Sequence, residues 1–307
     1  MAEINYNEET LMQKDFPEIK KLGAVSPFGD NMLFAWKERL YRFGFVDPAK
    51  SSAVFCFPQA AVRDAATGEF VSFLAQNSFF HSVYVENDTV YVLGVDMKER
   101  GRILIYESHD LVTWEERTLF ENSGWTYYNT SLTKGPDGYV LALESDHPDF
   151  AGVPFTAFFA KSPDLVDWEF VDYDLGYAKD RYIGSPRLIY SDGWYYLTVS
   201  EQLPCKRFAS YIHRTRDFRD WYVGLYNPII MPSHEDRQVS PRASDIDRVT
   251  LERMKKSFIS SNSEIALCEF GGKTYIGYVA GNQLGSYHTA EAEYDGPLDE
   301  FLKSFFE

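Results

Sequence analysis

The 307-residue sequence has few cysteines and lacks a long apolar run. Cys56, Cys205 and Cys268 are odd in number and lack metal-type spacing, which argues against a disulfide framework and predicts reduced thiols. No apolar run approaches the roughly 20 residues that a membrane span needs. Residues 1–5 lack a basic segment followed by an apolar one, as a signal peptide would have. We therefore expect a cytoplasmic protein with no membrane partner.

Basic residues are scarce as well. The chain carries 30 Lys and Arg against 46 Asp and Glu, a formal net charge of −16 at pH 7. A surface of that sign repels nucleic acid and anionic membranes, so neither is expected as a partner. The sequence does not indicate an oligomeric state.

Aromatic residues are abundant, at 17% of the chain, within a hydrophobic fraction of 45%. Many fall in alternating runs, such as residues 194–199, and that period of two is typical of pleated strands. The length fits one large β domain or two ordinary ones.

One motif occurs three times, at residues 107–114, 161–168 and 214–221. Each copy contains Ser or Thr, then Asp two residues later, an apolar residue and a final Trp, and the tryptophans lie 54 and then 53 residues apart. A fixed period of this size is typical of repeat architectures, and propeller blades are all-β units of about this length. We interpret the motif as the hairpin between the third and outermost strands of a blade, with the Trp covering the blade edge.

Five further hairpins fit the same scheme. They span residues 30–43, 81–93, 129–144, 185–201 and 262–279, with turns such as Asp-Gly and Gly-Gly between alternating apolar runs. The predicted fold is all-β, a five-bladed β-propeller forming a single domain over residues 1–307.

Short helices are predicted around the propeller. Residues 7–21 could form a helix or an arm, and 298–306 a closing helix. Residues 227–258 form an insertion between blades four and five, a possible wall or lid over the pocket, with a helix over Asp245–Lys256 capped by Ser244-Asp245.

Propeller geometry limits where a site can be, because starts of first strands and ends of second strands meet at one mouth. Polar residues gather at these positions, although each could instead satisfy a turn. The candidates that bind substrate are Asn31, His81, Asn129, Arg181, Arg187, Asn262, Asn282 and Gln283; the candidate carboxylates are Asp30, Glu144, Glu201 and Glu264. Carboxylates and amides beside aromatic rings suit a carbohydrate, whose hydroxyls need bidentate partners.

The five-blade pattern, the Ser-x-Asp-Leu-x-x-Trp motif and the Asp-Gly-x-Tyr-Tyr return together resemble the five-bladed β-propeller glycoside hydrolases. That group includes families 43, 32 and 62 and, more distantly, the mannoside phosphorylases. The resemblance covers about residues 28–295. The segments 129–131, 177–182, 262–264, 281–285 and 290–296 also resemble a branch similar to family 43.

The resemblance implies three acids: a base Asp, an Asp that tunes the pKa of the acid, and a Glu as general acid. Asp30 matches the base, with Asn31 in place of the usual Pro. The tuning position falls on Asn129-Thr130 and the acid on Gly184-Ser185-Pro186, so two carboxylates are missing.

The general acid must then come from elsewhere. Burial beside aromatic rings would raise the pKa of a glutamate, and we rank Glu201 first, then Glu264, then Glu144. His81 could act as an acid, hold a metal or be a satisfied core histidine. Arg181 and Arg187 could bind an anionic substrate group or form ion pairs with Asp180 or a nearby Glu. No cofactor is required, although a structural Ca²⁺ could occupy the central channel.

Three functions compete. A glycoside hydrolase would use Asp30 as base or nucleophile on a small glycan or oligosaccharide. A glycoside phosphorylase would need a single carboxylic acid, because phosphate replaces water. A non-catalytic sugar-binding propeller would bind without turnover.

Overall fold

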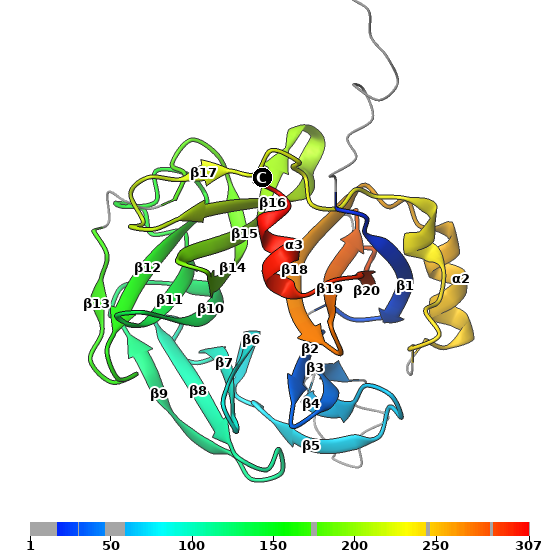
Figure 1. The fold of residues 1–307 in the computed structure, drawn as a ribbon, viewed down its shortest axis with the longest axis horizontal. Helices are drawn as coiled ribbons and strands as arrows, with labels where there is room; N and C mark the ends of the chain where they lie inside the picture. The colour runs from blue at the N-terminus through cyan, green and yellow to red at the C-terminus, as the bar shows by residue number, and fades with distance from the viewer. Residues whose placement is uncertain are drawn as a thin grey trace, which may run out of the picture.

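The computed structural model describes residues 17–29, 31–46, 59–172, 177–243, 246–282 and 285–306. The chain is mostly β-strand, because the alternating runs join through short turns into antiparallel hairpins. The strands pair into five four-stranded antiparallel groups. In Figure 1 these groups surround a central axis, each with its first strand innermost.

The groups follow one another along the chain. Group one is β2 (Met32–Trp36), β3 (Arg39–Val46), β4 (Gln59–Asp64) and β5 (Phe70–Leu74). Group two is β6 (Ser78–Glu86), β7 (Thr89–Asp96), β8 (Arg102–Ser108) and β9 (Glu115–Glu121), and group three is β10 (Tyr127–Gly135), β11 (Gly138–Ser145), β12 (Thr156–Ser162) and β13 (Glu169–Phe170). Group four is β14 (Ile183–Ser191), β15 (Trp194–Leu203), β16 (Arg207–Thr215) and β17 (Tyr222–Val223). Group five is β18 (Ser261–Phe270), β19 (Lys273–Gly281), β20 (Tyr287–Tyr294) and β1 (Lys20–Ser26). One parallel bridge, between Ala209 and Asn262, joins groups four and five.

Group five is completed by the N-terminal part of the chain. Strand β1 pairs antiparallel with β20, so residues 20–26 supply the outermost strand of the last group. This strand differs from the helix or arm predicted for residues 7–21. Lys20 and Lys21 are in fact strand residues, whereas residues 7–16 lie outside the described part. Pairing the two ends of the chain closes the ring of groups.

The repeated motif forms the turn between the third and fourth strands of groups two, three and four. Asp110 Oδ1 accepts hydrogen bonds from the main-chain N–H groups of Val112 and Thr113, at 2.8 and 2.7 Å, and Asp164 and Asp217 do the same in their copies. Trp114 Nε1 donates to Ser72 Oγ, on β5, at 3.1 Å. The tryptophan therefore packs against the preceding group.

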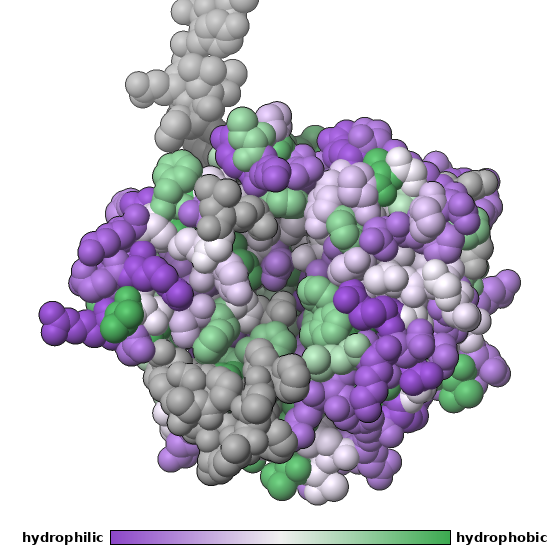
Figure 2. Space-filling model, turned by 180° about the vertical axis from the view of Figure 1, so that it is seen from behind, coloured by the Kyte–Doolittle hydropathy of each residue, from purple (hydrophilic) through white to green (hydrophobic). Residues whose placement is uncertain are grey.

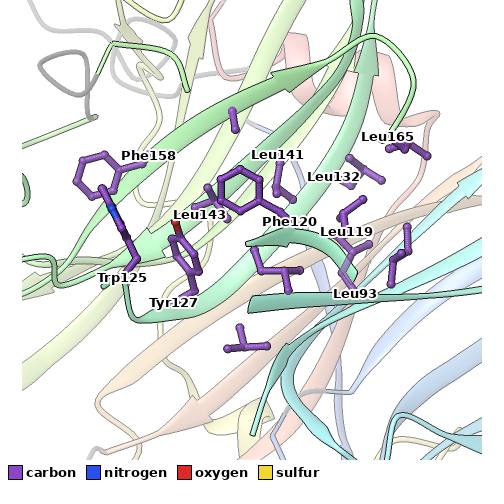
Figure 3. Close-up of a cluster of buried hydrophobic side chains, with 14 of the residues drawn as sticks. Leu93, Leu119, Phe120, Trp125, Tyr127, Leu132, Leu141, Leu143, Phe158 and Leu165 are labelled. Atoms are coloured by element: carbon purple, nitrogen blue, oxygen red, sulfur yellow. The ribbon is translucent and has the colours of Figure 1, made fainter. Parts of the chain in front are cut away.

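Aromatic and aliphatic clusters fill the space between neighbouring groups. One of them, between groups two and three, includes Leu93, Leu119, Phe120, Trp125, Tyr127, Leu132, Leu141, Leu143, Phe158 and Leu165 (Figure 3). Trp125 stacks on Tyr127 with ring centroids 5.7 Å apart, and these buried contacts hold the groups in fixed positions.

Two helices longer than one turn flank the described strands. Helix α2 (Arg248–Lys256) begins three residues after the predicted start, because Asp247 caps it by accepting a hydrogen bond from the Thr250 N–H. Ser244 and Asp245, the predicted cap, lie outside the described residues. Helix α3 (Leu298–Lys303) lies near the C-terminus (Figure 1). No helix in the described ranges has the length and apolar character that crossing a membrane requires.

The insertion packs beside β1. Lys21 Nζ donates to Met231 O, Ser233 Oγ and Asp236 Oδ1, at 2.6, 2.9 and 2.7 Å. Asp236 also accepts a 2.8 Å hydrogen bond from Tyr278 OH. These contacts fix the short 3₁₀ helix η4 (His234–Arg237) against group five.

A channel of about 360 Å³ runs along the axis between the inner strands β2, β6, β10, β14 and β18. Leu298 of α3 lines one end, and the Leu298 N–H donates to Glu269 near the end of β18. The starts of the inner strands therefore lie at the opposite end, which we call the mouth.

Candidate active site at the mouth

Two adjoining pockets lie at the mouth. Pocket A, of about 240 Å³, is lined by Phe80, Tyr128, Asn129, Glu144, Phe155, Tyr182, Gly184, Ser185, Ser200, Phe208, Ser263 and Glu264. Pocket B, of about 260 Å³, is lined by Gly29, Phe80, Ser261, Ser263, Glu264, Val279, Gly281 and Tyr287. Figure 2 shows this face of the molecule, which is hollowed near its middle with apolar side chains around the hollow.

Bulges near the starts of the inner strands direct side chains into the pockets. The pairing register of β6, β14 and β18 shifts after Phe79, Gly184 and Ser263. The next residues, Phe80, Ser185 and Glu264, have φ of 57°, 52° and 58°. An extra residue in one strand turns its side chain away from the regular alternation, which is a common use of bulges beside functional sites.

Glu144 is a buried carboxylate of pocket A, with a side chain that is 3% exposed. Its Oε2 accepts hydrogen bonds from Asn129 Nδ2 and from the Ser185 main-chain N–H, both at 2.8 Å. Burial raises the pKa of Glu144, and the Ser185 and Asn129 donors and the charge of Arg187 oppose that rise only in part. A carboxylate with a raised pKa is a stronger base and can exchange protons nearer neutral pH.

Glu264 is the second carboxylate and lines both pockets. It is half-buried, and its main-chain N–H donates to Ser200 Oγ at 2.9 Å, which ties the bulge of β18 to β15. Burial raises the pKa of Tyr182, and the negative charges of Glu144 and Glu264 raise it further. Both carboxylates are therefore close enough to Tyr182 to change its pKa, which is consistent with their lining the same pocket.

Aromatic rings form much of the wall of pocket A. Phe155 contacts Tyr128 and Tyr182 edge to face, with centroids 4.7 and 4.8 Å apart, and Tyr182 contacts Phe208 at 5.2 Å. Arg100 lies behind the wall, with its guanidinium carbon 4.6 Å from the centroid of Tyr128. Rings on several sides can stack on the apolar faces of a sugar and exclude water.

The charged side chains that line these pockets differ from those of a phosphate-binding site. Among the residues that line pockets A and B there is no Lys, Arg or His, whereas both contain a carboxylate. An anion that contacts only these described residues would therefore meet like charge without a cationic partner. The pockets suit an uncharged ligand.

Glu201, the first choice for the general acid, faces away from the pockets. Ser200 lines pocket A, and side chains alternate along a strand, so the next residue points to the opposite face. Glu201 Oε2 lies 3.2 Å from Arg181 Nη1, and its Oε1 lies 3.3 Å from His213 Nε2. Arg181 also binds Asp180, so it has the structural ion pairs that the sequence analysis gave as its alternative.

Arg187 and His81 lie below the pockets. Arg187 lines the channel and donates from Nη1 to Thr130 O at 2.8 Å and from Nη2 to His81 O at 3.2 Å. The His81 side chain is fully buried, with its Nε2 3.1 Å from Ser78 Oγ. Burial lowers the pKa of His81 to about 3, so the ring is neutral and is a core histidine.

The predicted amides take different places. Asn129 is in pocket A, where it holds Glu144. Asn31 donates to Ser26 Oγ and to Gly29 O, both at 3.1 Å, and so holds the loop before β2. Asn282 Oδ1 accepts a hydrogen bond from the Ser286 N–H in the turn after β19. Asn262 is fully buried and does not line pocket A or B.

Asp30 and Gln283 lie outside the described residues. The described residues of the insertion line neither pocket, so its predicted role as a wall or lid has no support from the pocket linings.

The aromatic wall was not among the residues predicted from sequence. Phe80 and Tyr128 directly precede the predicted His81 and Asn129, and the bulges make the preceding residue a pocket residue. Paired aromatics before a polar residue, Phe79-Phe80-His81 and Tyr127-Tyr128-Asn129, were the available signal. Phe155, Phe208 and Tyr287 come from loops and strands whose positions only the fold brings together.

The described channel residues offer no cluster of acidic, His or Cys side chains for the Ca²⁺ considered from sequence. No group of three or more Asp, Glu, His or Cys in the described ranges is arranged to hold a metal. The main-chain oxygens of His81 and Thr130, which could have been calcium ligands, instead accept from the cationic Arg187.

No protein-family model matches the sequence. Solved structures with a similar fold include several glycoside hydrolases. One, named simply a glycoside hydrolase, has a TM-score of 0.60 at 11% identity, covering 96% of this protein and 97% of that one. A thermostable family-43 glycoside hydrolase has a TM-score of 0.58 at 13% identity, covering 88% and 90%. The α-L-arabinofuranosidase PaAbf62A of Podospora anserina, in complex with cellotriose, has a TM-score of 0.60 at 10% identity, covering 92% and 98%. The fold is thus similar to that of glycoside hydrolase families 43 and 62, as the resemblance in the sequence predicted.

Proposed function

We propose that this protein is a glycoside hydrolase that cleaves a small neutral glycan or oligosaccharide. Its five strand groups would be the blades of a five-bladed propeller, and residues 227–258 a helical insertion between the last two. The observation that carries the proposal is the pair of glutamates, Glu144 and Glu264, in one aromatic pocket without basic side chains. Two carboxylates beside one sugar are the usual requirement for glycoside hydrolysis.

The reaction needs one group that gives a proton to the glycosidic oxygen and another that activates water or attacks the anomeric carbon. Glu144 fits the second role, because two N–H donors orient its carboxylate and burial raises its pKa. Glu264 then supplies the proton. Asp30, the base implied by the family resemblance, lies outside the described residues and remains part of this proposal as a third acid.

Pentose substrates are the first to test. The similar structures include a xylan β-1,4-xylosidase of Bacillus halodurans and an arabinanase of Bacillus subtilis, at 13% identity each. Their names give substrates for those proteins, and we carry them over only as the start of a panel. The proposal includes the cytoplasm as the site of action, which suits short oligosaccharides.

Phosphorolysis is less well supported. A phosphate nucleophile would need cationic partners at the reacting centre, and neither pocket lining contains one. Arg181 is bound to Asp180 and Glu201, while Arg187 donates to main-chain oxygens in the channel.

The test is turnover of xylobiose, 1,5-arabinobiose and aryl pentosides by the wild type and by Glu144→Gln, Glu264→Gln and Asp30→Asn. We expect kcat/KM on the natural-type disaccharide to fall by about 10² to 10⁴ in each variant, with an unchanged circular dichroism spectrum. Glu201→Gln is the control, because it removes a buried carboxylate outside the pockets.

Full activity of Glu144→Gln would contradict the assignment. Binding without turnover of any disaccharide would favour a non-catalytic sugar-binding protein, and turnover that depends on added phosphate would favour a phosphorylase.

A further inference from the structure

Pocket B adjoins pocket A and shares a wall with it. Phe80, Ser263 and Glu264 line both. Pockets for drug-sized ligands are about 300–1,000 Å³. At about 240 and 260 Å³, each of these pockets is smaller than that, so each suits a single sugar ring. The two together form a site for two linked rings.

Tyr287 gives pocket B an aromatic surface. It begins β20 and is 55% exposed, although its ring lines the pocket. Two glycines let the ring lie close to the wall: a Cβ on Gly29 would stand 3.8 Å from the ring, and one on Gly281 would stand 3.0 Å from Tyr287 Cβ. An exposed ring at the edge of a pocket can stack on a sugar while its hydroxyl stays in water.

The carboxylates of Glu144 and Glu264 differ in which pockets they line. Glu144 lines pocket A only, whereas Glu264 lines both pockets. A bond between a sugar in pocket A and a sugar in pocket B must pass the shared wall, and Glu264 is the carboxylate on that wall. Glu144 is held on the other side by Asn129 and Ser185.

We propose that pocket B is the subsite for the departing sugar, with Tyr287 as its stacking surface and Glu264 as the proton donor to the bridging oxygen. This inference rests on the proposed hydrolase function. The substrate class is then a neutral glycan with at least two sugar units, because the described residues that line the two pockets include no cation for an acidic sugar.

The step is balanced by one water. The bond from the anomeric carbon in pocket A to the bridging oxygen breaks, and its electrons stay on that oxygen, which takes the proton of Glu264. The sugar in pocket B leaves as an alcohol. Water supplies hydroxide to the anomeric carbon and its remaining proton to the carboxylates, which restores the acid form of Glu264.

The experiment compares two substrates with the same sugar in pocket A: the disaccharide that the wild type hydrolyses, xylobiose or 1,5-arabinobiose, and the matching glycosyl fluoride. Fluoride leaves without a proton and without a ring in pocket B. For Tyr287→Ala we expect the ratio of kcat/KM for the disaccharide to that for the fluoride to fall about 10-fold, mainly through KM. Tyr287→Phe keeps the ring and should retain the ratio.

Tyr222→Ala is the matched control, since Tyr222 is 54% exposed on β17 and lines neither pocket. For Glu264→Gln the ratio should fall at least 100-fold, because only the disaccharide needs the proton.

The outcomes distinguish failure of the subsite from failure of the hydrolase function. Turnover with equal ratios in Tyr287→Ala, Tyr222→Ala and wild type overturns the subsite and leaves the hydrolase function standing. Equal losses on both substrates in Glu264→Gln overturn its role as proton donor. No turnover by the wild type of any disaccharide or glycosyl fluoride, across a panel of pentose and hexose substrates, overturns the hydrolase function and the subsite with it.

Discussion

His81 is a residue whose chemistry is set by burial. Its ring has no solvent exposure and contacts Phe43 and Phe45 edge-on, with centroids 5.2 and 5.5 Å away. An imidazolium there would lose its hydration, and burial lowers its pKa to about 3. It therefore serves as a neutral core group above about pH 4 rather than as an acid for catalysis.

The lowered pKa makes stability depend on pH. Between pH 6.5 and about 3 the unfolded chain binds a proton at His81 and the folded protein does not, so the free energy of unfolding falls as pH falls through this window. The slope from this group is at most about 1.4 kcal/mol per pH unit. We expect the stability difference between wild type and His81→Gln to shrink from pH 7 to pH 4 in urea titrations.

His234→Gln is the control for this measurement, because the His234 side chain is 78% exposed. If the free energies of unfolding of the wild type and of His81→Gln depended on pH in parallel, His81 would become protonated in the folded state, against this prediction.

At the scale of elements, strand β1 joins the ends of the chain and depends on one glycine. Gly23 has φ +95°, and its register with β20 shifts on either side. A Cβ at this position would lie 2.4 Å from the carbonyl oxygen of Gln238, in the insertion. The glycine therefore allows β1, β20 and the insertion to meet.

We expect Gly23→Ala to lower the free energy of unfolding by about 2–4 kcal/mol, from the combined strain of positive φ and the backbone clash. Gly124→Ala is the matched control, with φ +84° and nothing within 4 Å of an added Cβ. Its loss should be about 1 kcal/mol, from the backbone conformation alone. Equal midpoints of urea unfolding for the two variants would contradict the close approach.

At the scale of the whole molecule, a charged arginine side chain links the strands that surround the channel. Arg187, from β14, reaches main-chain oxygens of β6 and β10 and so links three strand groups on the axis. Replacing it leaves buried carbonyl oxygens without these donors, at about 1–3 kcal/mol each.

We propose that this arrangement makes a channel Ca²⁺ unnecessary. Arg187→Met should lower the free energy of unfolding by about 3 kcal/mol. The exposed Arg207→Met is its control. Addition of EDTA to the wild type should leave the melting temperature and the turnover of disaccharide unchanged. A melting temperature that falls with EDTA and recovers with Ca²⁺ would refute the proposal.

The strand pattern and the mouth could be predicted from sequence because both follow from short-range chemistry. Alternating apolar runs and Asp-Gly turns fix antiparallel hairpins, and the repeated Asp turn fixes where the third strand of groups two, three and four ends. Glu144, Glu264 and Asn129 were predicted this way, from strand ends, and all three line pocket A.

Assignments that depend on a single residue of register are the ones that the pocket geometry does not support. Glu201 was ranked first, yet it points to the far side of β15 because Ser200 takes the pocket side. Likewise, the bulge in β6 gives the pocket Phe80 and buries His81. Side chains alternate with a period of two, so a shift of one residue changes the face completely.

The sequence by itself determined the all-β character, the repeated groups and the set of carboxylates and amides at strand ends, because these follow from local periodicity and turn residues. Only the tertiary structure decided which carboxylates share a pocket and that β1 closes group five. It also decided that Arg187 donates to main-chain oxygens and that Arg181 forms ion pairs with Asp180 and Glu201. Those results depend on contacts between residues far apart in the chain and on register shifts, which local pattern does not encode.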